Sequence, residues 1–367
     1  MPASRPPPDR IALDATLWDE PTTGIGLYVR SLARALESSG THVVRLGASV
    51  SGEYPRGAVG RTAWTLGGLP EALRHSEAPL FHAAGNFNLP LTRAPGKAYV
   101  LTVHDLIPEL MPETVSAAFR WQFRLWLGRS AALADRIICV SARTREDLLG
   151  RYDLDADKVE VVHNGVDHVD RVPPPDEVGL QYLDALALPE RYVLYAGSLD
   201  VRKNAALVIE AVARLRREGR PCTLVLAGQS WFGAGPVERR IGELRAEGLD
   251  VRPLGYLAAP LFYEVMRRAS VFAFPSRYEG FGLPPLEAMR LGVPCVVSDR
   301  GSLREVCGDA ARYVDPDDAR GLAETLAGLL ASDAERQKLS EAGRAQAAKF
   351  TWADAAKKTL QVYAKAL

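Results

Sequence analysis

Eleven short apolar runs, separated by amphipathic segments, constrain the fold of this 367-residue chain more than any other feature. Most of them hold four to six consecutive apolar residues without polar alternation. Strands covered by helices on both faces have this pattern, whereas strands with one solvent-exposed face alternate. The regular alternation with helical segments such as 203–218 and 235–247 therefore predicts an α/β fold with parallel, doubly wound sheets. The runs are RIALDA, HVVRL, PLFHAA, AYVLTV, RIICVS and VEVVHN, then RYVLYAG, CTLVLAG, VRPLGY, SVFAFPS and PCVVSD.

The strand–helix series occurs twice, and the chain is longer than one ordinary core requires. Between the two series lie three consecutive prolines, 173–175, which cannot continue a helix or a central strand. We therefore predict an N-terminal Rossmann-like domain, residues 1–171, facing a C-terminal one, residues 172–350, across a cleft. Ligands in such sheets bind beyond the carboxyl ends of the strands. The final segment, 351–367, is predicted to be a helix that packs back on the first domain.

The charge balance argues against one broad class of function. The chain has 45 basic and 45 acidic residues, whereas nucleic-acid-binding proteins usually carry a basic excess. The N-terminal MPASRPPPDR lacks the apolar core of a secretory signal, and no apolar run reaches the 18 residues of a membrane span. We expect a cytoplasmic protein, and peripheral contact with the inner face of the membrane stays open.

The cysteines and histidines do not form metal-site patterns. No C-x-x-C pair is present, and three of the four cysteines lie in strand-like runs, which indicates buried free thiols in a reducing compartment. His163 and His168 are five residues apart, without a cysteine or an H-E-x-x-H motif beside them. We therefore predict no metal and no cofactor. The cysteines are Cys139, Cys222, Cys295 and Cys307.

The stretch SRYEGFGLPPLEAMRLG, residues 276–292, combines two carboxylates with glycines and a double proline. It follows a predicted strand and contains a helix start, because proline is favoured in the first helical positions. We expect the backbone N–H groups of Phe281, Gly282 and Leu283 to form an anion site at the helix N-terminus. Glu287 would fall in the first helical turn and Glu279 in the preceding loop, both facing one cleft. Carboxylates there suit a vicinal diol of a sugar. The alternatives are a helix-dipole role for Glu287 and a solvated loop position for Glu279.

Two cations precede a predicted helix in YAGSLDVRKNAALVIEA. Asn204 is a good N-cap residue type, so Arg202 and Lys203 would lie at the positive end of the helix dipole. That placement is unfavourable unless an anion with more than one charge binds there, and a diphosphate fits. The alternative is an exposed pair of cations solvated by water.

Two further features lie in the first half of the chain. Gly24 and Gly26 lie just before an amphipathic helix and could offer N–H donors to phosphate, although they do not complete G-x-G-x-x-G. His104 follows an apolar strand, where it could donate to a sugar hydroxyl. A plain strand–helix turn and an ordinary loop histidine are the alternatives.

The segment SAAFRWQFRLWLGRSAAL reads as a helix with aromatic residues on two faces. Phe119, Phe123 and Trp126 share one stripe, and Trp121 and Leu125 lie on the other side. Arginines flank both groups, which suits a membrane surface or a lipid-linked acceptor near residues 116–133. The alternative is a helix buried on both sides.

Several of these segments occur together and in order in one known family. The chain resembles the retaining, GT-B-fold, nucleotide-sugar-dependent glycosyltransferases of family four, and the resemblance covers nearly the whole chain. Its most specific element is the E-x7-E signature from Glu279 to Glu287. The segments GSLDVRKN, VVHNGVD, LGYL and GVPCVVSDRGSLREVCGDAARYVDPDD are also similar to segments of that family.

The resemblance implies a role for each site residue. Arg202 and Lys203 would bind the donor diphosphate, Glu287 the ribose hydroxyls and Glu279 the hydroxyls of the donor sugar. Gly26 would approach the diphosphate from the first domain, His104 would contact the sugar, and catalysis would need no metal ion. We expect Glu279, Arg202, Lys203 and His104 to be catalytic. The other expected donor-binding residues are Gly24, Gly26, Gly197, Gly228, Tyr256, Gly280, Phe281, Gly282, Leu283 and Glu287, with the base near Gly228 and Tyr256.

The resemblance also implies a mechanism and a substrate class. The leaving diphosphate would gain negative charge that Arg202 and Lys203 stabilise, and same-face attack would retain the anomeric configuration. TVHDLIPELMPE is most similar to mannosyltransferases of surface-polysaccharide pathways, which indicates GDP-mannose as donor and a glycan or lipid-linked saccharide as acceptor. UDP- and dTDP-sugars, a nucleotide-sugar 2-epimerase and an inactive sugar-nucleotide-binding module are the alternatives.

Overall fold

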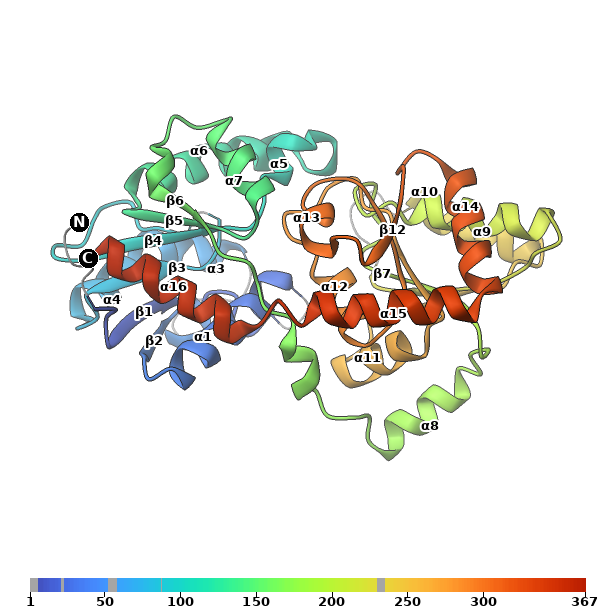
Figure 1. Ribbon diagram of the computed structural model, residues 1–367. Helices are drawn as coiled ribbons and strands as arrows, with labels where there is room; N and C mark the ends of the chain where they lie inside the picture. The colour runs from blue at the N-terminus through green and yellow to red at the C-terminus, as the bar shows by residue number, and fades with distance from the viewer. Residues whose placement is uncertain (1–5, 21–22, 52–57, 87, 230–234) are drawn as a thin grey trace. The chain divides into compact units, whose positions relative to one another are not determined.

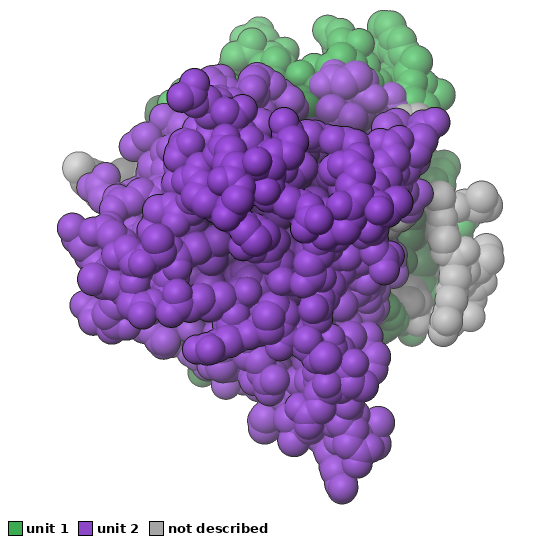
Figure 2. Space-filling model, turned by 90° about the vertical axis from the view of Figure 1, so that its right-hand side faces the viewer, with its two compact units in different colours: residues 1–112, 116–165, 350–367 green, residues 113–115, 166–349 purple. Residues whose placement is uncertain are grey.

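The chain folds into two compact units, which the computed structural model describes over residues 6–20, 23–51, 58–86, 88–229 and 235–367 (Figure 1). Unit 1 comprises Met1–Pro112, Ser116–Gly165 and Phe350–Leu367, and unit 2 comprises Glu113–Val115 and Val166–Lys349. Figure 2 colours the two units separately. Each unit is built on one six-stranded sheet whose neighbouring strands all pair in parallel. The predicted α/β fold with two parallel sheets is confirmed.

Unit 1 has the strand order β2-β1-β3-β4-β5-β6. Its strands are β1 Arg10–Asp14, β2 His42–Leu46, β3 Leu80–Ala83, β4 Ala98–Val103, β5 Arg136–Cys139 and β6 Val159–Val161. Its α-helices are α1 Gly24–Ser38, α2 Ala48–Ser51, α3 Ala58–Ala63, α4 Leu69–His75, α5 Ile107–Leu110, α6 Ala117–Leu133, α7 Ala142–Leu149 and α16 Trp352–Ala366. The short helical turns of the chain are η1 Trp64–Gly68, η2 Pro112–Thr114, η3 Ala156–Lys158 and η4 Asp167–Arg171.

Helices cover both faces of the unit 1 sheet, which explains its unbroken apolar strands. Alternate residues of β4 belong to different apolar clusters: Tyr99 packs in one that includes α6, and Val100 in one that includes α1 and α16. Trp352 and Tyr363 of α16 are fully buried in the second cluster. The last helix of the chain therefore completes the core of the unit that contains the first strand.

Unit 2 has the strand order β12-β11-β10-β7-β8-β9. Its strands are β7 Tyr192–Ala196, β8 Thr223–Ala227, β9 Val251–Gly255, β10 Val271–Phe274, β11 Cys295–Ser298 and β12 Ala311–Val314. Its α-helices are α8 Glu177–Ala185, α9 Ala205–Arg217, α10 Gly235–Ala246, α11 Ala259–Arg268, α12 Leu283–Arg290, α13 Leu303–Cys307, α14 Ala319–Ala331 and α15 Asp333–Ala347.

The topology of unit 2 defines where a ligand would bind. From β7 the chain moves outward to β8 and β9, and it then returns to β10 on the other side of β7 and continues to β11 and β12. The loops after β7 and β10 therefore diverge at a topological switch point, the usual ligand site of an open parallel sheet. These two loops contain Arg202, Lys203 and Glu279.

Two details differ from the sequence-based expectations. The units divide between Gly165 and Val166 instead of after residue 171, so the three prolines lie inside unit 2, between η4 and α8. The edge strand β12, Ala311–Val314, was not predicted. Its middle residues are not fully buried, so it lacks the continuous apolar run of a central strand.

Candidate active site

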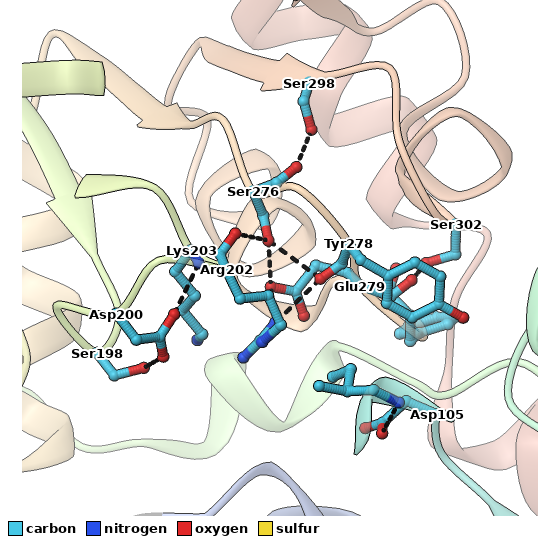
Figure 3. Close-up of polar contacts among 12 residues, drawn as sticks. Asp105, Ser198, Asp200, Arg202, Lys203, Ser276, Tyr278, Glu279, Ser298 and Ser302 are labelled. Atoms are coloured by element: carbon cyan, nitrogen blue, oxygen red, sulfur yellow. Dashed lines mark hydrogen bonds and ion pairs between the residues drawn. The ribbon is translucent and has the colours of Figure 1, made fainter. Parts of the chain in front are cut away.

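The loops after β7 and β10 are joined by several hydrogen bonds (Figure 3). The N–H of Arg277 donates to the carbonyl oxygen of Arg202 at 2.7 Å, and the hydroxyl oxygen of Ser276 lies 3.2 Å from the same carbonyl oxygen. Asn204 occupies the predicted N-cap position of α9, but its side chain does not cap the helix. Its amide instead donates to the carbonyl oxygens of Pro275 and Pro316, at 3.2 and 2.7 Å. The residue predicted to cap a helix therefore holds two loops together.

Arg202 and Glu279 form a largely buried ion pair between these loops. Nη1 of Arg202 lies 2.6 Å from Oε1 of Glu279, and the two side chains are 14% and 13% exposed. The same Nη1 donates to the carbonyl oxygen of Tyr278 at 3.0 Å, and the hydroxyl of Ser276 donates to Oε1 of Glu279 at 2.9 Å. Glu279 is therefore a fixed carboxylate, which excludes its reading as a solvated loop acid.

The ammonium of Lys203 lies close to carboxylates but bonds to none of them within the described residues. No hydrogen bond or ion pair from its ammonium group occurs within the described part of the chain, and Nζ lies 5.5 Å from the centroid of the Phe274 ring. Burial is the main cause that lowers its pKa, and the nearby Glu279 carboxylate opposes that shift. Asp200 fixes the backbone, because its Oδ1 accepts from the N–H of Lys203 at 2.8 Å. Such a cation can take a bound anion as its counter-charge.

The N-terminus of α12 presents backbone donors after the β10 loop. Gly282, at φ +101°, occupies the N-cap position, and the next two helical residues after Leu283 are prolines. The N–H groups of Gly282 and Leu283 donate no hydrogen bond to any described residue. The hydroxyl of Ser302 contacts the loop, because it lies 2.7 Å from the carbonyl oxygen of Phe281 and 3.0 Å from that of Glu279 (Figure 3). Two of the three N–H groups predicted to form an anion site therefore have no hydrogen-bond partner among the described residues.

Glu287 lies in the second turn of α12, not in the first turn as expected. The difference arises because the helix begins at Leu283, four residues earlier. Glu287 is only 6% exposed, which excludes a simple surface dipole role. Its Oε1 accepts hydrogen bonds from Nε2 of His168 at 2.9 Å and from the hydroxyl of Tyr263 at 3.2 Å.

The two glutamates of the E-x7-E pattern share one arrangement. In each of them Oε1 accepts two hydrogen bonds from neighbouring side chains. Neither Oε2 accepts a hydrogen bond from any residue that the structure describes. Each carboxylate is therefore oriented by the protein, and its second oxygen remains a hydrogen-bond acceptor without a partner among the described residues.

Two glycines allow the strand ends to approach closely. A Cβ atom on Gly228 would lie 2.0 Å from the carbonyl oxygen of Gly197, and one on Gly197 would lie 2.6 Å from Cδ of Lys203. Gly228 also lines a hollow of about 480 Å³, together with Leu199, Ile241 and Gly255. Tyr256 does not line this hollow and is 49% exposed. The structure thus places one of the two residues expected near the base beside a cavity.

In unit 1, Gly24 and Gly26 lie within the first turn of α1 instead of before it. The N–H of Gly26 donates to the hydroxyl of the N-cap residue Thr23 at 3.0 Å, so this N–H already has a partner. A Cβ on Gly26 would lie 2.4 Å from the carbonyl oxygen of Glu20. Packing of the preceding loop is therefore sufficient to explain this glycine.

His104 is buried, and its ring has a defined orientation. Nε2 lies 2.8 Å from the carbonyl oxygen of Ala84, which can only accept, so Nε2 carries the proton. Burial lowers the pKa of His104 to about 4, and the neutral ring therefore leaves Nδ1 as an acceptor. We expected His104 to donate a hydrogen bond to a sugar hydroxyl. With this tautomer, the free Nδ1 atom can only accept a hydrogen bond from one.

Helix α6 is buried on one face only. Phe123 is 2% exposed, whereas Trp121 and Leu125 are 64% and 66% exposed. Phe119 is 40% exposed, a value between that of Phe123 and those of Trp121 and Leu125. The alternative of a helix buried on both sides is therefore wrong.

Other chemistry is limited within the described residues. No group of three His, Cys, Asp or Glu side chains there could hold a metal ion. All four cysteines are free thiols. No described helix is both long and apolar enough to cross a bilayer.

The family of this chain is shown by comparison with known proteins. Residues 22–170 match the family described as Glycosyltransferase Family 4, and residues 184–346 match Glycosyl transferases group 1. The O-antigen chain mannosyltransferase B of Escherichia coli is 31% identical over 307 residues, which cover 83% of this chain and 77% of that protein. The chain therefore belongs to the group 1, family 4 glycosyltransferases.

Two further similarities are informative. An alpha-maltose-1-phosphate synthase of Mycolicibacterium smegmatis is 30% identical over 291 residues, covering 74% of this chain and 73% of that one. The crystal structure of Anabaena Alr3699/HepE in complex with UDP and glucose matches with a TM-score of 0.72 and 19% identity, covering 95% and 98% of the two chains. This structural likeness shows the GT-B fold. The chain is thus a GT-B glycosyltransferase.

Sequence reasoning found the charged residues of the site but missed the side chains that orient them. His168, Tyr263 and Ser276 lie 119, 24 and 3 residues from the glutamates that they contact. Only Ser276 stood inside a noted motif. The other two contacts depend on tertiary packing, for which a single sequence offers no pattern.

Proposed function

We propose that this protein is a retaining hexosyltransferase that transfers mannose from GDP-mannose to a glycan or a lipid-linked saccharide in polysaccharide biosynthesis. The observation that carries this proposal is the uncompensated ammonium of Lys203 at the switch point of unit 2. The unbonded backbone donors of Gly282 and Leu283, at the start of α12, support it. Cations and helix N-termini together suit a diphosphate.

The donor would be held through its three parts. The diphosphate would contact Lys203 and the N-terminus of α12, assisted by the Arg202 guanidinium. The ribose hydroxyls would donate to Oε2 of Glu287, and the hexose hydroxyls to Oε2 of Glu279. The base would occupy the hollow beside Gly228, whose walls include the apolar side chains of Leu199 and Ile241.

The chemistry follows from where charge develops. As the anomeric C–O bond breaks, its electron pair stays on the diphosphate and positive charge develops on the sugar. Lys203 and the backbone N–H groups stabilise the leaving diphosphate electrostatically. The acceptor hydroxyl oxygen then bonds to the anomeric carbon on the same face, and its proton passes to the leaving phosphate oxygen. Atoms and charge balance without a metal ion, and the anomeric configuration is retained.

The proposed identities of the donor and the acceptor rest on similarity to other proteins more than on the geometry of the site. The E. coli relative that shares 31% identity is named as an O-antigen chain mannosyltransferase, and O-antigen chains are surface polysaccharides. A relative of similar identity is named as an alpha-maltose-1-phosphate synthase, so the similarity alone does not select mannose as the donor sugar. We therefore treat UDP- and dTDP-sugars as the outcomes against which GDP-mannose is tested.

We also propose a peripheral place at the cytoplasmic face of the membrane. The exposed Trp121 and Leu125 on α6, with exposed Arg120 and Arg124 beside them, suit the interface of an anionic bilayer. Binding there would bring the enzyme to a lipid-linked acceptor. Flotation with vesicles containing anionic lipid, comparing the wild type with a Trp121→Ala, Leu125→Ala double variant, tests this part.

A ligand screen tests the donor. Thermal unfolding is measured with GDP, UDP, dTDP, ADP and their sugar conjugates, because a ligand stabilises by about RT ln(1 + [L]/Kd). We expect the largest shift with GDP-mannose. A larger shift with another nucleotide sugar would replace the donor, and no shift with any of them would reject the transferase. A sugar epimerised without acceptor would indicate an epimerase, and NMR of the glycosidic product would test retention.

A further inference from the structure

Glu287 is held by side chains from two other elements of unit 2. Its Oε1 accepts from Nε2 of His168, in η4, at 2.9 Å and from the hydroxyl of Tyr263, in α11, at 3.2 Å. All three side chains are buried: Glu287 is 6% exposed, and His168 and Tyr263 are each 8% exposed. The rings of His168 and Tyr263 are also neighbours, with centroids 6.4 Å apart and planes tilted by 56°. The contact is therefore a packed three-residue cluster.

Both contacts have a defined direction. Burial, reinforced by the Glu287 carboxylate, raises the pKa of Tyr263, so its hydroxyl keeps the proton and donates it. A carboxylate only accepts, so His168 must present the Nε2–H tautomer. The two donors reach the same oxygen, and the second oxygen of Glu287 has no partner within the described residues.

Two donors on one oxygen remove the freedom that a glutamate otherwise has. The terminal torsion of a glutamate is broad and roughly two-fold, so an unrestrained carboxylate presents either oxygen in many orientations. A binding group must be held within about half an ångström of its productive position by the residues behind it. Fixing Oε1 fixes Oε2 as well, because the carboxylate is planar and rigid.

We propose that His168 and Tyr263 are positioning residues that orient Oε2 of Glu287 toward the ribose hydroxyls of the donor nucleotide. This inference rests on the proposed function, in which Glu287 binds the ribose. It adds that ribose recognition depends on a histidine two residues after Val166, where the main segment of unit 2 begins.

The same two elements are also linked by a contact that offers a matched control. Arg290, also on α12, forms an ion pair with Asp170 of η4, and these side chains are 28% and 47% exposed. Removing this pair loosens the junction between η4 and α12 without touching Glu287. The variant Arg290→Gln therefore measures how far loosening of the contact between η4 and α12 alone changes nucleotide binding.

The test compares GDP with 2′-deoxy-GDP, and UDP with 2′-deoxy-UDP in parallel, by calorimetric titration. Hydrogen bonds to a carboxylate are strong, so the wild type should bind the ribonucleotide about ten-fold or more tightly than the deoxynucleotide. We expect His168→Ala to reduce that ratio to about two-fold, and Tyr263→Phe to reduce it partly. His168→Gln, whose amide can reach the position of Nε2, should restore much of it, and Arg290→Gln should keep the wild-type ratio.

Steady-state kinetics should also show an effect on donor binding more than on the chemical step. The ribose is remote from the reacting carbon, so its contact is equal in ground and transition states, and its loss raises KM more than it lowers kcat. We expect His168→Ala to raise the KM for GDP-mannose about ten-fold with kcat within about two-fold of wild type.

Three outcomes would overturn the inference, and they are distinguishable. In the first, the wild type prefers the ribonucleotide, and both His168→Ala and Tyr263→Phe keep the wild-type affinity ratio of ribonucleotide to deoxynucleotide. This result rejects the positioning role but leaves the ribose contact of Glu287 in place. Equal loss of both nucleotides in His168→Ala indicates a structural role only. A wild type that does not discriminate in either nucleotide pair rejects the ribose contact of Glu287, and with it the donor site of the proposed function.

Discussion

Arg202 and Glu279 form an ion pair of 2.6 Å across the switch point of unit 2, and Lys203, the next residue after Arg202, forms none with any described residue. One cation is therefore neutralised within the protein and its neighbour is not. The pair fixes the geometry of both loops, whereas Lys203 would supply positive charge to the diphosphate of the proposed donor. The consequences of substituting these residues differ accordingly.

Glu279→Gln should separate nucleotide binding from turnover. The amide keeps the shape of the side chain but removes a negative charge beside the diphosphate site and releases the Arg202 guanidinium. We expect the affinity for GDP to stay equal or rise by up to about ten-fold, as charge-assisted contacts of this size allow. Transfer should fall about a hundred-fold or more, since the sugar hydroxyls lose an oriented acceptor. Calorimetry and steady-state kinetics measure the two effects.

Ser276→Ala is the control for that substitution. It removes one 2.9 Å hydrogen bond to Glu279 and leaves the ion pair with Arg202 in place. We expect a smaller effect on turnover and no gain in GDP affinity. If Glu279→Gln instead weakened GDP binding as strongly as it slowed transfer, Glu279 would be a binding residue for the nucleotide itself.

Lys203→Met should stabilise the protein and inactivate it. The native ammonium has no hydrogen-bond or ion-pair partner among the described residues, and burial lowers its pKa, so an apolar side chain of similar length removes a desolvation cost. We expect a gain of about 1 kcal/mol in the free energy of unfolding, a common outcome when buried charges are replaced. Turnover should fall at least about a thousand-fold because leaving-group stabilisation is lost. A variant that loses stability would show that the ammonium has a compensating contact.

Binding of a nucleoside diphosphate should take up protons at alkaline pH. Burial lowers the pKa of Lys203 in the free protein, so its ammonium loses its proton at a lower pH than an exposed lysine does. A bound diphosphate favours the charged form and raises that pKa again, so affinity falls as pH rises through the pKa of the free protein. Titration calorimetry of GDP in two buffers of different ionisation enthalpy measures the uptake. Lys203→Met should abolish it, and uptake that persists in this variant would contradict the assignment.

Gly228→Ala should be strongly destabilising. The new Cβ would lie 2.0 Å from the carbonyl oxygen of Gly197, and the backbone at Gly228 has φ +147°. Neither a rotamer change nor a small shift relieves contact with a carbonyl oxygen, so a loss of about 3 kcal/mol or more is expected. Gly328→Ala, in α14, is the matched control, because a Cβ there meets nothing within 4 Å. It should stabilise by about 0.5–1 kcal/mol. Equal effects in chemical denaturation would refute the close approach.

The fold was predictable because its main signal is local. Continuous apolar runs predicted eleven strands, among them β7 and β8, and the same alternation implied two parallel sheets. The edge strand β12 escaped prediction because its pattern is partly exposed. The unit boundary was placed at the prolines, although the chain crosses between units at residues 165 and 166, where the sequence has no break in composition.

The sequence was sufficient to predict which charged residues form the candidate site, but not how their side chains are oriented. Arg202, Lys203, Glu279 and Glu287 stood out by charge and spacing. The ion pair between Arg202 and Glu279, and the tautomer of His104, depend on atoms brought together by folding. Asn204 illustrates the limit well: its position at the start of α9 was predicted, and the partners of its side chain were not.

Two buried histidines should make unit 1 sensitive to mild acid. Burial lowers the pKa of His82 to about 3 and that of His104 to about 4, whereas both titrate near about 6.5 in an unfolded chain. Between those values the unfolded state binds more protons, so the free energy of unfolding falls as pH falls below about 6.5. Each histidine contributes a slope of up to about 1.4 kcal/mol per pH unit.

The substitution His82→Gln isolates one of these contributions. His82 accepts or donates one hydrogen bond each with Thr102 and Tyr363, both at 2.7 Å, and an amide side chain can replace part of that pairing without titrating. Hydrogen exchange of β3 and β4 amides, measured from pH 6.5 to 5, should show a smaller loss of protection with pH in the variant, corrected for intrinsic exchange. A slope unchanged from wild type would mean that His82 is not the group whose protonation destabilises the sheet, and the same comparison with His104→Asn would then identify the remaining one.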